Sequence, residues 1–229
     1  MKKTKNNKKL IEKIDISKIY EPLEAIKILK ENSFTKFEET IEVAINLGID
    51  TNKTDQNIRG VSSLPNGTGK NINVAVLAKG EKQIEAKEAG ADTIGDEDLI
   101  EKIASGKINF DILIATPDMM PSAGKVAKIL GPKGLMPNPK LGTVTQDINT
   151  AVKNAKSGQV QYKNDKGGII HAGIGKMNFN DDHLIENLKA FFSSINKSKP
   201  DAVKGSFIKK VTIASTMGVG LEINATSLR

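Results

Sequence analysis

A change of hydrophobic pattern near Ile72 is the feature that most restricts how this chain of 229 residues folds. From there on, short apolar runs such as INVAVLA and FDILIA alternate with segments that have the composition of helices, such as EKQIEAKEAG. Buried strands that are separated by helices are typical of parallel βα units. Residues 69–158 are therefore predicted to form a compact α/β domain, whose last helix, over 147–156, is stopped by Gly158.

The segment before this domain has a different pattern. A short helix is predicted over 22–31, and Ile41, Val43 and Ile45 alternate with polar residues. A period of two is expected for a strand with one buried face, so a strand is predicted over 42–46.

The segment after the α/β domain has the same kind of strand and helix pattern as the segment before it. It contains two predicted strands joined by a turn over 164–167, and then a long amphipathic helix capped by Asp181 or Asp182. Two further strands around a glycine-bearing turn end the chain. We therefore predict a discontinuous antiparallel α+β domain, residues 1–68 and 159–229, into which the parallel α/β domain is inserted. Two chain segments that cross between the domains would form a hinge.

The N-terminal sequence MKKTKNNKK is polar, positive and without hydrophobic periodicity. We expect a flexible tail that attracts phosphates weakly. No window approaches the ~18 uninterrupted apolar residues of a membrane span, so no membrane partner is expected.

The absence of cysteine excludes thiolate metal sites, disulfides and cysteine nucleophiles. The only two histidines, His171 and His183, are far apart in sequence, which makes a histidine-based metal site improbable. We predict neither a metal nor a cofactor.

The sequence GTGK at 67–70 is the strongest indication of a nucleotide-dependent enzyme. A phosphate-binding loop also requires a glycine five residues before the last glycine and a serine or threonine after the lysine. Leu64 and Asn71 occupy these positions. Carboxylates such as Asp96 stand where helix caps are expected. We therefore predict that the protein is not an enzyme.

The net charge of +7 and the isoelectric point near 9.3 favour a polyanionic partner. Only Arg59 and Arg229 among the 34 basic residues are arginine, so bidentate recognition of guanine edges cannot be the main source of selectivity. Selectivity would have to come from shape, backbone contacts and a few stacked side chains, which favours RNA over duplex DNA.

The segment GPKGLMPNPKLGTV, from Gly131 to Val144, contains three of the eight prolines and three glycines. No ordinary helix or central strand tolerates this composition, so a stiff, bent loop is predicted, with Lys133 and Lys140 on it. Its role is either that of a rigid structural turn or that of a surface facing phosphates.

Four motifs in order carry a resemblance to a known family over nearly the whole chain. They are IRGVSSLPNGTGK at 58–70, TPDMMPSAGKVAKILGPKGLMPNPKLGTVT at 116–145, GQVQYKNDKGGIIHAGIGKMNF at 158–179 and STMGVG at 215–220. Together they resemble the bacterial type of the L-one family of large-subunit ribosomal proteins. Lys133 and Ala123 stand where members commonly carry arginine and valine, and both preserve the local character.

The resemblance implies a discontinuous RNA-binding domain with an inserted Rossmann-like domain, in a protein of the cytoplasmic ribosome. The implied partners are the large ribosomal subunit with its 23S rRNA at the mobile stalk, and the exit-site tRNA, whose release the protein assists. Many bacterial members also repress translation of their own operon mRNA. The alternative is a free RNA-binding translational regulator that is not assembled into ribosomes.

The resemblance also implies which residues form the RNA face. Four properties would together suit RNA: small hydroxyl donors, a soft or flat apolar surface, a glycine that lets nucleotides approach the backbone, and the positive charge of lysine. By composition alone, Phe37 and Met217 would be core residues, and the resemblance reverses that preference. The matching positions are Lys36, Phe37, Ser215, Thr216, Met217 and Gly218, with Lys166, Gly167 and Gly168 expected to flank them.

Overall fold

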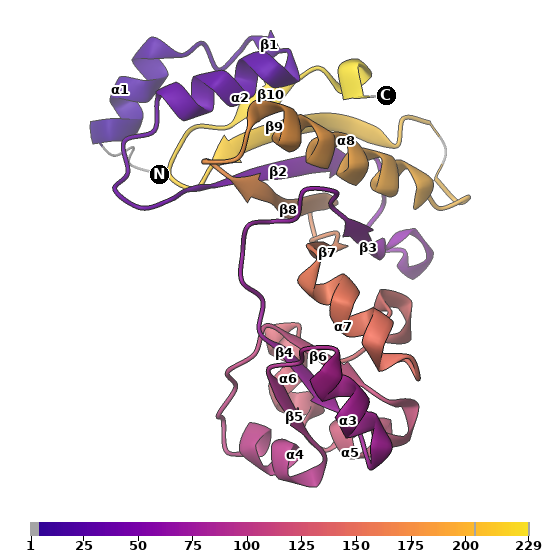
Figure 1. The fold of residues 1–229 in the computed structure, drawn as a ribbon. Coiled ribbons are helices and arrows are strands. Elements are labelled where there is room, and N and C mark those ends of the chain that lie inside the picture. Colours follow the sequence, from indigo (N-terminus) through magenta and orange to yellow (C-terminus); the bar gives the residue numbers. More distant parts are fainter. Residues whose placement is uncertain (1–4, 204, 229) are drawn as a thin grey trace. The chain divides into compact units, whose positions relative to one another are not determined.

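The computed structural model describes residues 5–203 and 205–228. The chain divides into two compact units (Figure 1). Unit 1 consists of Met1–Gly69 and Val160–Arg229, and unit 2 of Lys70–Gln159. The chain therefore leaves unit 1 once and returns to it once, and the boundaries lie one residue from those expected from the sequence.

Unit 1 contains a five-stranded sheet with the strand order β1-β10-β9-β2-β8. Strand β2 lies between β8 and β9 and is antiparallel to both. The short pair β1 and β10 is parallel, and the other pairs of this sheet are antiparallel, as expected for the α+β domain. The bounds of the strands are Ile19–Tyr20 for β1, Thr40–Leu47 for β2, Ile169–Lys176 for β8, Ile208–Ser215 for β9 and Leu221–Ile223 for β10.

Helices cover the buried face of this sheet. The predicted helix over 22–31 is α2 (Pro22–Glu31), and the long amphipathic helix is α8 (Asp181–Lys197), which packs against α2 and β8. Ile41, Val43 and Ile45 are buried beneath them, as the alternating pattern predicted. The other face of β2 carries the exposed Glu42 and the partly exposed Ala44 and Asn46.

Unit 1 also contains several smaller elements. Strands β3 (Arg59–Ser63) and β7 (Gln159–Lys163) form a separate two-stranded sheet, next to the two points where the chain passes between the units. Two 3-10 turns, η1 (Thr54–Gln56) and η4 (Ala225–Leu228), lie before β3 and after β10.

Residues 5–13 form helix α1 (Lys5–Lys13), so the expectation of a flexible tail is wrong for this part of MKKTKNNKK. Leu10 and the following Ile14 are buried in the core of unit 1 and anchor the helix. The pattern was missed because these two apolar residues lie at or beyond the end of the polar run. Residues 1–4 of that expected tail lie outside the described residues.

The N-terminus of α8 also differs from the prediction. Its N-cap residue is Asn180, and the expected caps Asp181 and Asp182 lie in the first turn of the helix. There their negative charges are favourably placed near the positive end of the helix dipole. Asp181 also forms an ion pair with Lys30 of α2, which links the two helices.

Unit 2 is the predicted parallel α/β domain. Its three strands have the order β5-β4-β6 and are all parallel, and apolar clusters cover both faces. The strands are β4 (Val74–Leu77), β5 (Thr93–Gly95) and β6 (Ile112–Ala115). The helices are α3 (Glu81–Glu88), α4 (Glu97–Ala104), α5 (Met120–Gly124), α6 (Ala127–Lys133) and α7 (Ile148–Lys156), with 3-10 turns η2 (Pro117–Met119) and η3 (Pro139–Leu141).

The segment from Gly131 to Val144 is only partly the loop that its composition predicted. Its first three residues form the end of α6, and the helix stops at Gly134, whose φ of 74° is left-handed. A proline is tolerated at position 132 because only one late backbone bond of a short helix is lost. Beyond Gly134, the side chain of Asn138 accepts a hydrogen bond from the amide of Lys140 and starts η3.

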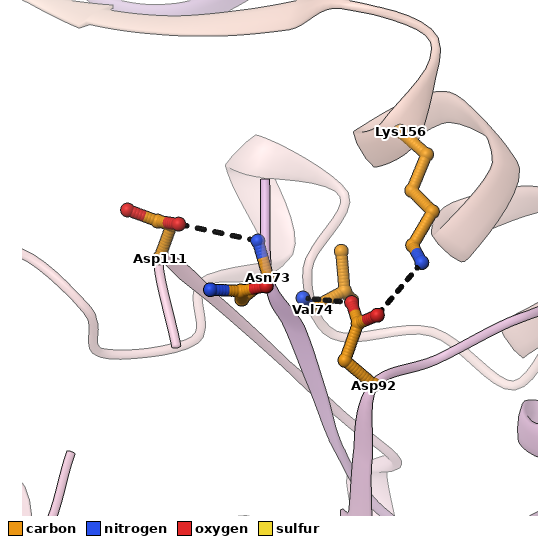
Figure 2. A network of polar contacts seen from close by, with 5 residues as sticks. All are labelled: Asn73, Val74, Asp92, Asp111 and Lys156. Atoms are coloured by element: carbon orange, nitrogen blue, oxygen red, sulfur yellow. Dashed lines mark hydrogen bonds and ion pairs between the residues drawn. The ribbon is translucent and has the colours of Figure 1, made fainter. Parts of the chain in front are cut away.

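Two aspartates hold the start of β4 (Figure 2). Asp92 accepts a hydrogen bond of 2.9 Å from the Val74 amide and one of 3.1 Å from Lys156. Asp111 accepts one of 3.1 Å from the Asn73 amide. It also accepts one of 2.7 Å from Lys70, which is not drawn in the figure. These bonds lower the pKa of both carboxyl groups.

The positions of the two lysines give these bonds a structural role. Lys70 is the first residue of unit 2, and Lys156 lies three residues before its end. Both ends of the inserted segment are therefore tied to the sheet of unit 2. Among the described residues, no helix is both long and apolar enough to cross a membrane.

Candidate nucleic-acid interface

The start of β2 and the end of β9 lie at the same end of the large sheet. Ile41 of β2 is paired with Ser215 of β9, and Thr40 is paired with Lys176, the last residue of β8. The turn that follows β9 contains the predicted RNA-binding residues Thr216, Met217 and Gly218. The register of the strands therefore places this turn beside the segment that leads from Lys36 into β2.

Hydrogen bonds to the start of β2 hold the turn in place. The hydroxyl oxygen of Thr216 accepts a bond of 3.0 Å from the Thr40 amide and donates one of 3.3 Å to the Thr40 carbonyl. The Met217 amide donates to Oε1 of Glu39 at 3.0 Å, and the Gly218 amide donates to the Ser215 carbonyl at 3.1 Å. The Thr216 hydroxyl and the amides of Met217 and Gly218 are thus used within the protein.

Ser215 and Thr216 are placed differently from what we expected. Ser215 is 6% exposed, and the hydroxyl of Thr216 is bonded to Thr40, so neither is a free donor for a ligand. Packing within the protein also favours glycine at position 218, in addition to any close approach of a ligand. A Cβ atom there would clash with Oγ of Ser215, so a larger residue would require that hydroxyl to rotate away.

The apolar residues of this region face solvent. Phe37 is 55% exposed and Met217 is 48% exposed, so the assignment of both to the core by composition alone is wrong. Lys36 is also exposed, and the Thr35 hydroxyl fixes this loop by donating to the Phe37 carbonyl at 3.0 Å. We call the surface formed by Lys36, Phe37, Thr216, Met217 and Gly218 the turn patch.

The remaining three predicted residues do not flank this patch. Lys166, Gly167 and Gly168 form the turn between β7 and β8, and the Gly168 carbonyl accepts a hydrogen bond from the amide of Leu47, at the far end of β2. The eight residues of β2 separate the two ends by about 24 Å. A sequence motif gives no strand register, which is why this expectation failed.

The turn at Lys166 borders a groove of 620 Å³. Its cations are Arg59 from β3, Lys163 from β7 and Lys166 itself. The Asn164 side chain braces the groove, because its Oδ1 accepts a bond of 2.7 Å from the Ile58 amide. We call these three cations and the groove they line the groove patch.

The turn at Lys166 is itself tightly ordered. Asp165 accepts bonds of 2.8 Å from the amides of both Gly167 and Ile169, which lower the pKa of its carboxyl group. Gly168 has a left-handed φ of 73°, a conformation that favours glycine. The backbone of this turn therefore needs a glycine here whether or not a ligand is bound.

Sequence reasoning missed several residues of both patches. Glu39, Thr40 and Lys176 support the turn patch, and Lys176 donates a bond of 3.0 Å to the Thr40 hydroxyl. No sequence signal distinguishes them. The sequence singles out Arg59 as one of only two arginines and does not place it in a groove. Within residues 5–203 and 205–228, no three acidic, histidine or cysteine side chains are grouped so that they could hold a metal ion.

Comparison with known proteins agrees with the architecture. Residues 29–219 match the model of the Ribosomal protein L1p/L10e family. The chain belongs to this family. Both patches lie within the matched residues, whereas α1 lies outside them. Membership of this family of structural proteins also confirms that the chain is not an enzyme.

Individual relatives cover the chain almost completely. The chain is 53% identical over 227 residues to the large ribosomal subunit protein uL1 of Alcanivorax borkumensis, with 99% of this chain and 98% of the relative covered. The protein of the same name from Rickettsia peacockii is 54% identical over 217 residues, covering 95% and 91%. That of Haemophilus influenzae is 53% identical over 227 residues, covering 99% of each. The resemblance seen in the motifs is confirmed.

Proposed function

We propose that this member of the L1 family is a structural constituent of the large ribosomal subunit in the cytoplasm. In that role it binds large-subunit 23S rRNA, and unit 1 carries the binding surface. The observation that carries the proposal is the braced turn after β9, which exposes Met217 while its amide is bonded to Glu39. A surface whose polar groups are already bonded recognises shape, as RNA-binding surfaces commonly do.

The two patches support contact with a folded RNA rather than with a short single strand. The turn patch supplies apolar surface and one lysine, and the groove patch supplies three cations beside the other end of β2, a strand about 24 Å long. Apolar surface stacks on bases and sugars, and cations neutralise phosphates. An RNA that contacts both ends of β2 must therefore span at least this distance, and a folded RNA offers such a surface without the cost of ordering a flexible strand.

Footprinting on large-subunit rRNA tests this proposal. The purified protein is bound to the rRNA and to scrambled transcripts of equal length at near-physiological salt. We expect two protected regions on the rRNA and at least tenfold weaker binding of the scrambled RNA. Equal affinity for both would contradict the proposal.

We also propose that the protein assists release of deacylated tRNA from the exit site. Two chain segments join unit 2 to unit 1, and ion pairs tie both ends of unit 2 to its own sheet. Such an inserted unit can move as one body with the stalk and contact the exit-site tRNA. The test is the rate of exit-site tRNA release from ribosomes that contain or lack the protein.

Translational repression of the protein's own operon mRNA uses the same RNA surface in our proposal. A reporter behind the native leader should be repressed by the wild-type protein and not by a variant altered in the turn patch. Sedimentation distinguishes a ribosomal protein from the alternative, a free regulator outside the ribosome. A subunit protein migrates with the large subunit after a moderate-salt wash, whereas a regulator stays in the light fractions.

A further inference from the structure

Glu39 is a buried carboxylate directly behind the turn patch. Its side chain is 2% exposed, and both of its oxygens accept hydrogen bonds. Oε1 accepts from the Met217 amide at 3.0 Å, and Oε2 accepts from the Ser33 hydroxyl at 2.8 Å. The Glu39 carbonyl also accepts from the Met177 amide at 3.0 Å.

One residue thus connects four segments of unit 1. Ser33 begins the loop that carries Lys36 and Phe37, Glu39 itself precedes β2, Met177 follows β8, and Met217 lies in the turn after β9. These contacts join parts of the chain that are up to 178 residues apart. The two halves of the turn patch, one before β2 and one after β9, are therefore held by the same carboxylate.

Stability alone is a weak reason for such a residue. Burying a carboxylate carries a desolvation cost, and apolar replacements of buried charges are often neutral or stabilising. A negative charge behind a surface that binds phosphates also opposes binding. What the carboxylate does supply is two strong, directional, charge-assisted hydrogen bonds.

We propose that Glu39 is a positioning residue for RNA recognition. Its carboxylate sets the Met217 turn and, through Ser33, the loop of Lys36 and Phe37 into one surface before RNA arrives. A preformed surface binds more tightly because less ordering is required on association. This inference rests on the proposed binding of rRNA, and it adds the residue that sets the geometry of that site.

Two substitutions at this position separate geometry from charge. Glu39→Ala removes both hydrogen bonds. Glu39→Gln keeps an oxygen that can accept from Met217 and gains an amide that can donate to Ser33. Ile195→Val, in the buried face of α8, is the control for a loss of stability in unit 1 away from the patch.

Three quantities are measured for each variant: the melting temperature, the affinity for large-subunit rRNA, and the affinity for heparin as a non-specific polyanion. We expect Glu39→Ala to weaken rRNA binding about tenfold or more and to leave heparin binding within about twofold. Glu39→Gln should bind rRNA within about threefold of wild type. Ile195→Val should keep the affinity despite a lower melting temperature.

Hydrogen exchange of the Met217 amide gives a readout that needs no RNA. Exchange should be faster in Glu39→Ala and close to wild type in Glu39→Gln. The inference is overturned if Glu39→Ala binds rRNA as Ile195→Val does, or if Glu39→Gln binds as weakly as Glu39→Ala. If wild-type protein fails to distinguish rRNA from scrambled RNA, the proposed function itself fails, and that result is distinct from either variant outcome.

Discussion

The Thr40 amide nitrogen lies 3.0 Å from the hydroxyl oxygen of Thr216, and this bond joins the first residue of β2 to a turn 176 residues later. The same hydroxyl of Thr216 donates a second hydrogen bond, of 3.3 Å, to the Thr40 carbonyl, so the two residues are joined by a reciprocal pair of bonds. The side chain of Thr216, which a sequence comparison would assign directly to RNA, therefore helps Glu39 to hold the turn in place.

Replacing Thr216 by valine keeps the shape of the side chain and removes both bonds. We expect rRNA affinity to fall by about 1–3 kcal/mol with the fold intact, because the turn loses its attachment to β2. Thr93→Val, in β5 of unit 2, is the matched control. Unchanged affinity of the Thr216 variant, measured by filter binding, would remove this residue from the site.

Replacing Met217 by aspartate puts a negative charge at the centre of the turn patch. The expected loss in rRNA affinity is again about 1–3 kcal/mol, since an apolar contact is lost and a phosphate-repelling charge is gained. Ile84→Asp, at a 63% exposed apolar position of unit 2, adds the same charge elsewhere. Equal losses in the two variants would mean that only net charge matters.

The exposed lysines of α1 test its contribution to long-range attraction. Lys8→Gln with Lys9→Gln removes two charges and leaves the anchors Leu10 and Ile14 in place. The slope of log affinity against log salt should decrease by at most roughly 0.9 per lysine, with selectivity for rRNA unchanged. Loss of selectivity would show that α1 takes part in recognition.

Acid should destabilise unit 2 through Asp92. The pKa of its carboxyl group is lowered from 3.8, first by the hydrogen bond from the Val74 amide and then by Lys156. A depressed folded-state pKa gives a stability contribution that is present above 3.8 and lost as pH falls through the lowered value. The side chain is 41% exposed, so solvent screening keeps this contribution small.

Urea unfolding at several pH values between about 6 and 3 measures this contribution. Asp92→Asn should have a lower midpoint than wild type near neutral pH, and the difference should shrink below about pH 4. Glu85→Gln, on the exposed side of α3, is the control for the loss of one negative charge from unit 2. A difference that is constant with pH would exclude the ionised form of Asp92 as the cause.

The absence of cysteine makes the predicted hinge accessible to site-specific labelling. Spin labels at Lys189→Cys in α8 and Glu88→Cys in α3 report on the distance between the two units. We expect a broad or bimodal distance distribution in the free protein, because only two chain segments connect the units. One narrow distance would contradict the hinge.

The sequence predicted most of the local structure, because burial imposes a clear pattern on it. Val74 to Leu77 are buried on both faces of a parallel sheet, and the alternating residues of β2 are buried on one. Helix α1 was missed because its anchors lie outside the polar run, and the end of α6 was missed because a proline near a helix end costs little.

The candidate site was less predictable because it depends on register. The motifs named residues of both patches, but only strand pairing shows that Gly168 is beside Leu47 rather than beside Thr216. The supporting roles of Glu39 and Thr40 arise from contacts between segments far apart in sequence. Such contacts leave no local pattern, so exposure and bonding at Ser215 and Thr216 could not be foreseen.

The pairing of β3 with β7 has a consequence for how this protein can be altered. The strands that lead to and from unit 2 are neighbours in one small sheet, so the exit and return of the chain are already close together in unit 1. The residues between β3 and β7 can be replaced or deleted as one segment, with a short linker joining the two strands. The large sheet built on β2 would then keep all of its strands. All five strands of the large sheet come from residues outside this segment.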